Sequence, residues 1–214
     1  MSKRPFLILS LVVSILTLLY LILHRQGIIR KWQLQIYQPE DYLRKFAKIP
    51  KADKTKVVVA FSISEKLNLE QIKPFLNSLL DQTVKVDEII LNIPYKDMEI
   101  IPKRYKKILS VHGYSKDYEN AANLICSVLT EPEANTKIVL VEPNTMYNDD
   151  FIEMMVAKSN EQPDKIVYGN KDKNIKHGIL LKPKFFDNKI SDYQKGKGCC
   201  PWLDECTNVG AVYL

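Results

Sequence analysis

The feature that most constrains the fold is a short apolar run that ends in a polar cluster. Residues 138–141 read Ile-Val-Leu-Val, a continuous run rich in β-branched residues, which is typical of a strand covered on both faces inside a parallel sheet. Glu142 and Asn144 follow at once. In open α/β sheets, ligands bind outside the carboxyl ends of the strands. These two side chains therefore lie where a bound nucleotide or metal ion is expected.

The sequence on both sides of this run alternates between strand and helix patterns. Asn148 is expected to cap a helix that begins near Asp149 and Asp150, whose carboxylates suit its positive end. Alternating units of this kind predict an α/β fold with a doubly wound, Rossmann-like, mostly parallel sheet. The expected strands are residues 56–63, 88–93, 108–112, 138–141, 165–168 and 178–181, and the expected helices are residues 69–81, 119–129 and 149–160.

The amino-terminal part carries a long apolar run. Residues 6–23 hold no charged side chain, and at ~1.5 Å per residue they cross most of a ~30 Å hydrocarbon core. This predicts a transmembrane helix at residues 6–24 after a short tail at residues 1–5. A cleaved signal peptide is the alternative, but the run exceeds the usual length of about 7–15 residues and no small-x-small cleavage site follows. A retained, single-pass, amino-terminal membrane anchor is therefore favoured.

The side of the membrane on which the rest of the chain lies stays open. Lys3 and Arg4 precede the apolar run, and Arg25, Arg30, Lys31 and Arg44 follow it, so the positive charges give only a weak bias toward a cytosolic domain.

Residues 25–54 are expected to link the anchor to the domain. Trp32, Tyr37, Tyr42 and Phe46 are spaced as on an amphipathic juxtamembrane helix or stem. A lysine-rich break around Pro50 marks the boundary. The remaining residues, 55–214, are enough for one domain with a substantial core.

Composition excludes several classes of function. The net charge is +6, but the lysines are scattered, and no nucleic-acid-binding signature accompanies them, so nucleic acid is not an expected partner. The three carboxyl-terminal cysteines form Cys-Cys-x5-Cys, which lacks the paired spacing of a zinc site. Cys126 falls on an apolar helix face and is expected to be a buried thiol.

Three stretches together resemble the opening of GT-A-fold, glycosyltransferase-family-2-like proteins. They are Val-Val-Val-Ala-Phe-Ser-Ile at 57–63, Ser-Leu-Leu-Asp-Gln-Thr at 78–83 and Asp-Glu-Ile-Ile at 87–90. The resemblance continues through Lys-Asp-Tyr at 116–118 and residues 138–151, where the family carries an Asp-x-Asp motif. It implies a GT-A-like domain that transfers a sugar from a nucleotide-diphosphate sugar to a hydroxyl of a glycan, lipid or protein acceptor.

The resemblance also implies roles for individual residues. Glu142 and Asn144 stand at the metal position, where Mn²⁺ or Mg²⁺ would bridge the diphosphate of the donor and neutralise the leaving group. Asp117, Tyr118 and Ser62 stand near the nucleotide of the donor. Later in the chain, Asp204 and Glu205 resemble the acidic stretch from which inverting members take the base that deprotonates the acceptor hydroxyl.

The chain departs from the family pattern at the metal position. Glu142-Pro143-Asn144 replaces Asp-x-Asp, and an amide oxygen can bind a hard cation but brings no charge, so weaker metal binding is expected. Asn123 stands where a basic residue is expected. The sequence stops at Leu214, where the family usually completes its acceptor side, which suggests a truncated or degenerate enzyme.

Alternatives therefore stay open. Asp204 and Glu205 can equally be acidic residues at the start of a helix, and Asp117 can cap the helix that follows it. The protein is either a membrane-anchored glycosyltransferase or a catalytically impaired pseudo-glycosyltransferase that binds or scaffolds a partner glycosyltransferase. An unrelated Rossmann-like membrane protein is the third reading.

Overall fold

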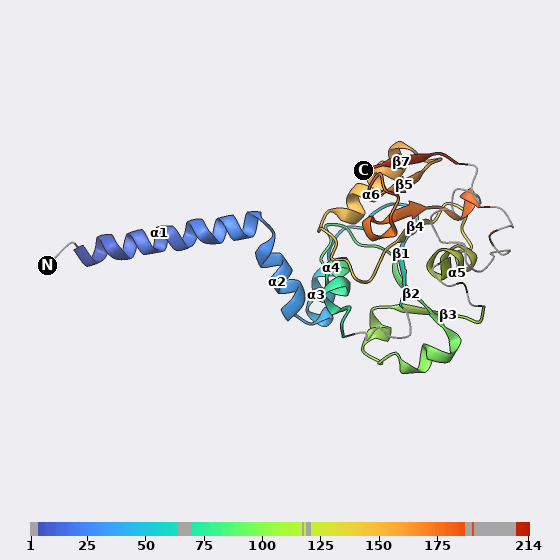
Figure 1. Ribbon diagram of the computed structural model, residues 1–214, viewed down its shortest axis with the longest axis horizontal. Helices are drawn as coiled ribbons and strands as arrows, with labels where there is room; N and C mark the ends of the chain where they lie inside the picture. Colours follow the sequence, from blue (N-terminus) through green and yellow to red (C-terminus); the bar gives the residue numbers. More distant parts are fainter. Residues whose placement is uncertain (1–3, 64–69, 117, 119–120, 187–189, 191–208) are drawn as a thin grey trace.

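A seven-stranded sheet forms the centre of the protein, and one long helix projects away from it (Figure 1). The computed structural model describes residues 4–63, 70–116, 118, 121–186, 190 and 209–214. The strand order is β3-β2-β1-β4-β6-β5-β7, which confirms the predicted doubly wound α/β sheet. The strands are β1 (Val57–Ser62), β2 (Glu88–Pro94), β3 (Ser110–Tyr114), β4 (Lys137–Leu140), β5 (Ile166–Tyr168), β6 (Ile179–Leu181) and β7 (Ala211–Tyr213).

The direction of the strands is mostly parallel. β1 pairs in parallel with β2 and with β4, and β2 pairs in parallel with β3. β6 is antiparallel to both of its neighbours, β4 and β5, whereas β7 is parallel to β5. The chain winds outward from β1 to β3 on one side and continues through β4 on the other. The boundary between β1 and β4 is therefore the topological switch point, where doubly wound sheets bind their ligands.

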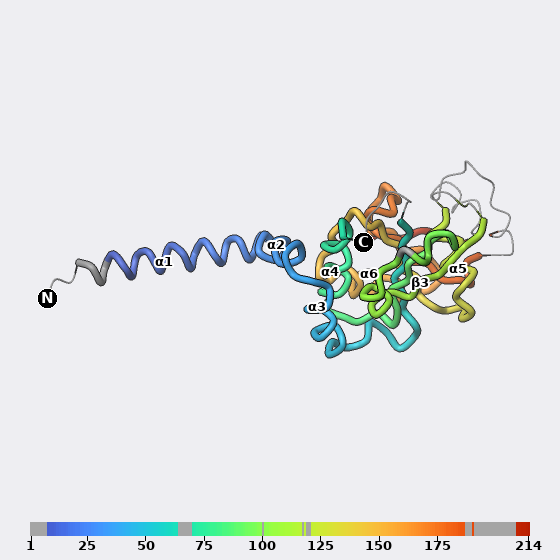
Figure 2. The backbone as a smooth tube through the Cα atoms, turned by 90° about the horizontal axis from the view of Figure 1, so that it is seen from below, coloured from blue at the N-terminus to red at the C-terminus, as the bar shows by residue number. Residues whose placement is uncertain are grey.

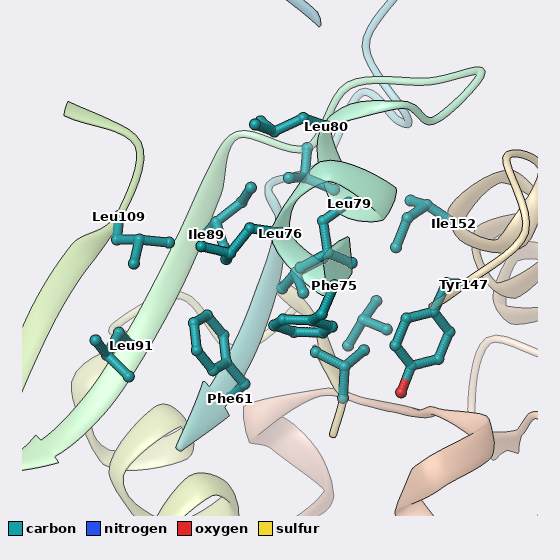
Figure 3. Close-up of a cluster of buried hydrophobic side chains, with 14 of the residues drawn as sticks. Phe61, Phe75, Leu76, Leu79, Leu80, Ile89, Leu91, Leu109, Tyr147 and Ile152 are labelled. Carbon is teal, nitrogen blue, oxygen red and sulfur yellow. The ribbon is translucent and has the colours of Figure 1, made fainter. Parts of the chain in front are cut away.

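Helices cover both faces of the sheet because successive side chains of each strand point to opposite faces. Val57, Val59 and Phe61 of β1 pack into one core with α4 (Lys73–Leu80) and α6 (Phe151–Glu161). Val58 and Ala60 pack into the other with α5 (Ala122–Thr130). Figure 3 shows the first core, in which the ring of Phe61 meets the ring of Phe75 from α4 edge-on, with 5.0 Å between their centroids.

The start of α6 differs from the sequence-based expectation. Asp150 occupies the N-cap position, and its own side chain makes no capping hydrogen bond. Asn148 contributes its backbone carbonyl instead, which accepts hydrogen bonds from the Phe151 amide at 3.3 Å and from Gln82 Nε2 at 2.6 Å. The expected Asn148 side-chain cap is therefore wrong, because this residue belongs to a loop held by α4.

The projecting helix is α1 (Arg4–Arg25), a single helix of 22 residues (Figure 2). Its segment Ile8–Arg25 is long and apolar enough to cross a membrane, and none of that segment is buried against the rest of the protein. A signal sequence near an amino terminus meets the same criteria of length and composition. The membrane anchor therefore stays a prediction.

The stretch between α1 and β1 forms two helices that pack on the domain. α2 (Ile28–Ile36) and α3 (Pro39–Phe46), here called the collar, both contact α4. Leu34 of α2 is fully buried, and the side-chain amide of Asn77 on α4 donates to the carbonyls of Leu34 at 2.8 Å and Tyr37 at 2.9 Å. The division of the chain into a stem at residues 25–54 and a domain at residues 55–214 stays a prediction.

Substitution of Gly178 tests how closely the start of β6 packs against α6, and substitution of Gly27 is the comparison. Gly178, with φ 85° and ψ 145°, precedes β6, and a Cβ there would lie 2.4 Å from Cζ of Phe151. We expect Gly178→Ala to cost about 1–3 kcal/mol from backbone strain and about 1–3 kcal/mol more from overpacking. Gly27 also has a positive φ, of 68°, but a Cβ there meets nothing within 4 Å, so Gly27→Ala should show only the backbone cost of about 1–2 kcal/mol. Urea unfolding of both variants measures the difference, and equal losses would contradict the packing of Phe151 on Gly178.

Candidate functional site

Polar side chains line up across the carboxyl edge of the parallel strands. Ser62, the last residue of β1, is in register with Asn92 of β2, which is in register with His112 of β3. Glu142 follows β4, the neighbour of β1 on its other side. This row of polar residues crosses the switch point between β1 and β4.

The row belongs to the face of the sheet that α5 covers. Residues two positions earlier in these strands, Ala60, Ile90 and Leu140, all pack into the core on the α5 side. Because side chains alternate between faces along a strand, Ser62 and Asn92 point to the same side. The polar edge thus sits directly beyond the hydrophobic core under α5.

Asn123 of α5 forms hydrogen bonds that connect the strands at this edge. Its Nδ2 donates to the carbonyl of Ala60 at 3.0 Å and to that of Val141 at 3.5 Å, and so bridges β1 and the residue after β4. Its Oδ1 accepts from Asn92 Nδ2 at 3.2 Å, and Ser127 Oγ accepts from the same nitrogen at 2.8 Å. Asn92 and Asn123 are both buried. Asn123, which replaces an expected basic residue, therefore has a structural role at the switch point.

The loop after β4 is held by the hydroxyl of Tyr147. This oxygen accepts a hydrogen bond from the Glu142 amide at 3.0 Å and donates to the Lys176 carbonyl at 3.1 Å. Burial raises the pKa of the Tyr147 hydroxyl well above its usual value, so the group stays protonated and can donate. Figure 3 shows the ring beside Phe75 with the hydroxyl directed out of the hydrophobic cluster. The backbone position of Glu142 is thus fixed from the core.

The motif that carries the family resemblance holds the same loop from the other end. Ser78 Oγ accepts from the Tyr147 amide at 3.1 Å. Gln82 Nε2 donates to the Asn148 carbonyl, and Gln82 Oε1 accepts from the Ile152 amide at 2.9 Å. The Ser-Leu-Leu-Asp-Gln-Thr stretch at 78–83 therefore positions the loop that follows Glu142, because Ser78 and Gln82 bind backbone groups of that loop.

The structure brings together only some of the predicted site residues. Ser62 and Glu142, both half-buried, lie at the ends of neighbouring strands. Asn144 is exposed and follows Glu142 in a turn that the Thr145 amide closes on the Glu142 carbonyl at 3.1 Å. Tyr118 lies at the β3 end of the sheet, where its ring is 6.1 Å from that of Tyr114. Asp117, Asp204 and Glu205 lie outside the described residues.

The donor set for a metal ion is small. In the part of the chain that the structure describes, no three or more His, Cys, Asp or Glu side chains gather as a metal site. Glu142 offers a carboxylate and Asn144 an amide oxygen, whereas Mg²⁺ prefers six oxygen ligands. These two residues alone do not make a metal site, so a metal ion there stays a prediction.

A hollow of about 430 Å³ lies elsewhere, between the collar and the end of α4. Its lysine and one of its aspartates already pair, with Lys45 Nζ 2.6 Å from Asp81 Oδ1, and burial raises the pKa of Tyr42 to about 12. None of the predicted site residues belongs to this hollow. The residues that line it are Gln33, Tyr37, Asp41, Tyr42, Lys45 and Asp81.

Comparison with known proteins adds evidence on the fold. No family model and no curated protein matches the sequence. Among solved structures, the protein is similar to 4-diphosphocytidyl-2C-methyl-D-erythritol synthase from Anaerococcus prevotii, with a TM-score of 0.53 and 12% identity over 75% of this chain and 90% of that one. A second structure of a synthase of this name gives a TM-score of 0.50 and 7% identity, again over 75% and 90% of the two chains.

This likeness is one of fold. The chain shares the α/β fold of these synthases, built on a mostly parallel sheet. At these identities the comparison does not extend to the reaction, and it does not separate a GT-A glycosyltransferase from other enzymes of this fold. The suggested glycosyl transfer therefore depends on the residues at the carboxyl edge.

Replacing Asn123 tests the bridge between β1 and β4. Asn123→Leu removes the donor to the Ala60 and Val141 carbonyls and one acceptor of the Asn92 side-chain amide, while Ala60 keeps the Val141 amide and Asn92 keeps Ser127 Oγ. Because a typical hydrogen bond contributes about 0.5–1.5 kcal/mol and a buried group left unsatisfied costs about 1–3 kcal/mol, we expect a total loss of about 1–3 kcal/mol of unfolding free energy, measured by urea denaturation. Asn135→Leu, at an exposed position, serves as the control and should change stability little. A similar small effect of both substitutions would contradict the bridge.

A second substitution tests whether the Tyr147 hydroxyl holds the Glu142 loop. Tyr147→Phe removes the oxygen that joins the Glu142 amide to the Lys176 carbonyl. Because two backbone groups lose their partner, unfolding free energy should fall by about 1–3 kcal/mol, and amide hydrogen exchange at Glu142 should accelerate. Tyr95→Phe, which alters an exposed tyrosine, should do neither. Unchanged exchange at Glu142 in Tyr147→Phe would show that the hydroxyl does not hold the loop.

Proposed function

We propose that the protein is a membrane-anchored glycosyltransferase that transfers a sugar from a nucleotide-diphosphate sugar to a hydroxyl of a glycan, lipid or protein acceptor. The observation that carries the proposal is the pair Ser62, the last residue of β1, and Glu142, two residues after the end of the parallel neighbour β4, at the topological switch point. This is the position at which doubly wound sheets bind nucleotides. The fold shared with the synthases named above supports nucleotide binding at this edge.

Roles for the individual residues follow from the place of each side chain. Ser62 and Tyr118, with Asp117, would contact the nucleotide of the donor. Glu142 and Asn144 would contribute two oxygen ligands to a Mn²⁺ or Mg²⁺ ion, and such an ion neutralises negative charge on a diphosphate leaving group. The remaining ligands would come from the diphosphate, from water and from residues outside the described part.

Asp204 or Glu205 would remove the proton from the attacking acceptor hydroxyl. A carboxylate can act as a general base when it lies within hydrogen-bond reach of the hydroxyl it activates. The resemblance to family-2-like enzymes is the support for this assignment.

The anchor is part of the proposal. α1 is long and apolar enough to span a bilayer, and the apolar side chains of Ile8–Arg25 remain uncovered by the domain. In water an uncovered apolar helix of this length is unfavourable, whereas in lipid it is the expected structure. The protein would therefore act at a membrane surface.

A second candidate function has its own observation. Asn144, which replaces the second acid of Asp-x-Asp, is exposed and neutral, and the described residues form no three-ligand metal group. A domain that keeps the fold but binds metal poorly would suit a pseudo-glycosyltransferase that scaffolds an active partner glycosyltransferase. Binding measurements separate the two candidates.

The deciding experiment is calorimetric titration of the full chain in lipid nanodiscs with UDP, GDP and their sugars, with and without Mn²⁺. Metal-dependent binding would support transfer, and the absence of binding by a folded chain would favour the scaffold.

We expect Glu142→Ala to abolish Mn²⁺-dependent binding without unfolding the protein, because Glu142 lies after the strand and outside the core. Glu133→Ala, at an exposed loop position, is the control. Undiminished Mn²⁺-dependent binding in Glu142→Ala would exclude its metal role.

Asn144→Asp should have the opposite effect. A second carboxylate beside Glu142 adds a charged ligand, which should tighten Mn²⁺-dependent donor binding on the order of tenfold, because hard cations are bound more tightly as the ligand charge rises. The same titration measures it. No gain in affinity would mean that the turn after β4 is not shaped to hold a cation.

A further inference from the structure

The collar helix α2 turns a charged residue toward the domain and apolar residues away from it. Leu34 is 0% exposed and faces α4, and Arg30, one turn earlier, lies on the same face. At 100° per residue, Trp32 and Ile36 fall on the opposite side of the helix. Their exposed fractions are 62% and 69%. The outward face of α2 is therefore apolar, and its inward face carries a charged residue.

The neighbouring helix α3 shows the usual arrangement. Tyr42, Leu43 and Phe46 pack against the core beside α4, whereas Glu40 and Arg44 are exposed. A helix that covers a soluble domain is expected to look like this, with its apolar stripe facing the core. Because α2 and α3 both pack on α4, the exposed apolar side chains of α2 point to a different surrounding on its outer side.

The position of α2 directly after α1 indicates what lies against its outer side. Only Gln26 and Gly27 separate α2 from the apolar helix α1. Gly27 has φ 68°, a left-handed conformation that ends the path of α1, and Figure 1 shows α2 turning away from the axis of α1. A helix that leaves a membrane-spanning segment at such a turn begins at the level of the lipid headgroups. Arg25 and Lys31 are exposed beside the turn, where cations favour anionic lipid.

We propose that α2 is an interfacial helix that places Trp32 and Ile36 in the boundary between headgroups and acyl chains. Helices of this kind bury an apolar face ~5–10 Å into that boundary, and tryptophan is enriched there. The ligand of this surface is the bilayer itself. The inference depends on the anchor in the proposed function but not on sugar transfer.

The inward contacts of α2 would connect the domain rigidly to this membrane-bound helix, an arrangement here called the seat. Arg30 Nε lies 2.8 Å from Asp81 Oδ2, and Arg30 Nη1 donates to the Tyr147 carbonyl at 2.9 Å. One helix thus contacts lipid on its outer side and the loop that carries Glu142 on its inner side. The bilayer would hold the domain in one orientation, with the carboxyl edge at a constant height above the membrane.

Tryptophan quenching by brominated lipids tests the seat. The full chain is reconstituted in bilayers with and without lipids brominated near the headgroup, and the emission of Trp32 is taken as the difference between the natural chain and Trp32→Phe. We expect a loss of roughly half of this emission, because an indole ~5–10 Å deep lies within reach of shallow bromines. The matched control adds Arg44→Trp to Trp32→Phe, which places an indole on the polar outer face of α3 and should be quenched much less.

The outcomes separate the seat from its alternatives. Alkaline carbonate extraction first shows whether α1 holds the chain in the bilayer, and a released chain would overturn both the anchor and the seat. In an anchored chain, red-shifted and unquenched Trp32 emission would overturn the seat alone. Blue-shifted but unquenched emission would mean that a second protein or a second copy covers α2, and would also overturn it. Equal quenching of Trp32 and of the Arg44→Trp indole would contradict a lipid contact specific to the outer face of α2.

Discussion

The site depends on side-chain amides that satisfy backbone groups beyond the ends of the parallel strands. The carbonyl of Val141 lies beyond the end of β4, and buried backbone groups without partners are costly. Asn123 donates to this carbonyl and also to the Ala60 carbonyl of β1, which already accepts from the Val141 amide. Gln82 does the same for the loop before α6, as donor and as acceptor. Two side-chain amides, Asn123 of α5 and Gln82 after α4, thus hold the edge at which a nucleotide would bind.

Much of the fold was predictable because its signals are local. Apolar β-branched runs indicated the six strands from β1 to β6, and the alternation with helices indicated a parallel, doubly wound sheet. The antiparallel direction of β6 was not indicated, since a three-residue strand carries no signal of direction. The Asn148 cap failed because a distant residue, Gln82, accepts the hydrogen bond from the Ile152 amide in the first turn of α6, and a contact between residues so far apart in the chain leaves no local signal.

The candidate site was predictable in part. The rule that ligands bind at the carboxyl ends of strands selected Glu142, and the structure places Ser62 beside it on the neighbouring strand. The network of Asn92, Asn123 and Ser127 was missed, although it left a signal: Asn123 and Ser127 are polar residues four positions apart on an otherwise apolar helix face. The motif at 78–83 resembled a catalytic family, yet the contacts of Ser78 and Gln82 are structural.

The collar also sets where this chain can be cut. A soluble version that begins near β1 would lose Leu34 and the rings of Tyr42 and Phe46, and so would leave the outer side of α4 in water with its apolar residues uncovered. It would also leave Asp81 without its two cationic partners, Arg30 and Lys45. A version that starts at α2 keeps these contacts, whereas a shorter version would be prone to aggregate for reasons unrelated to catalysis.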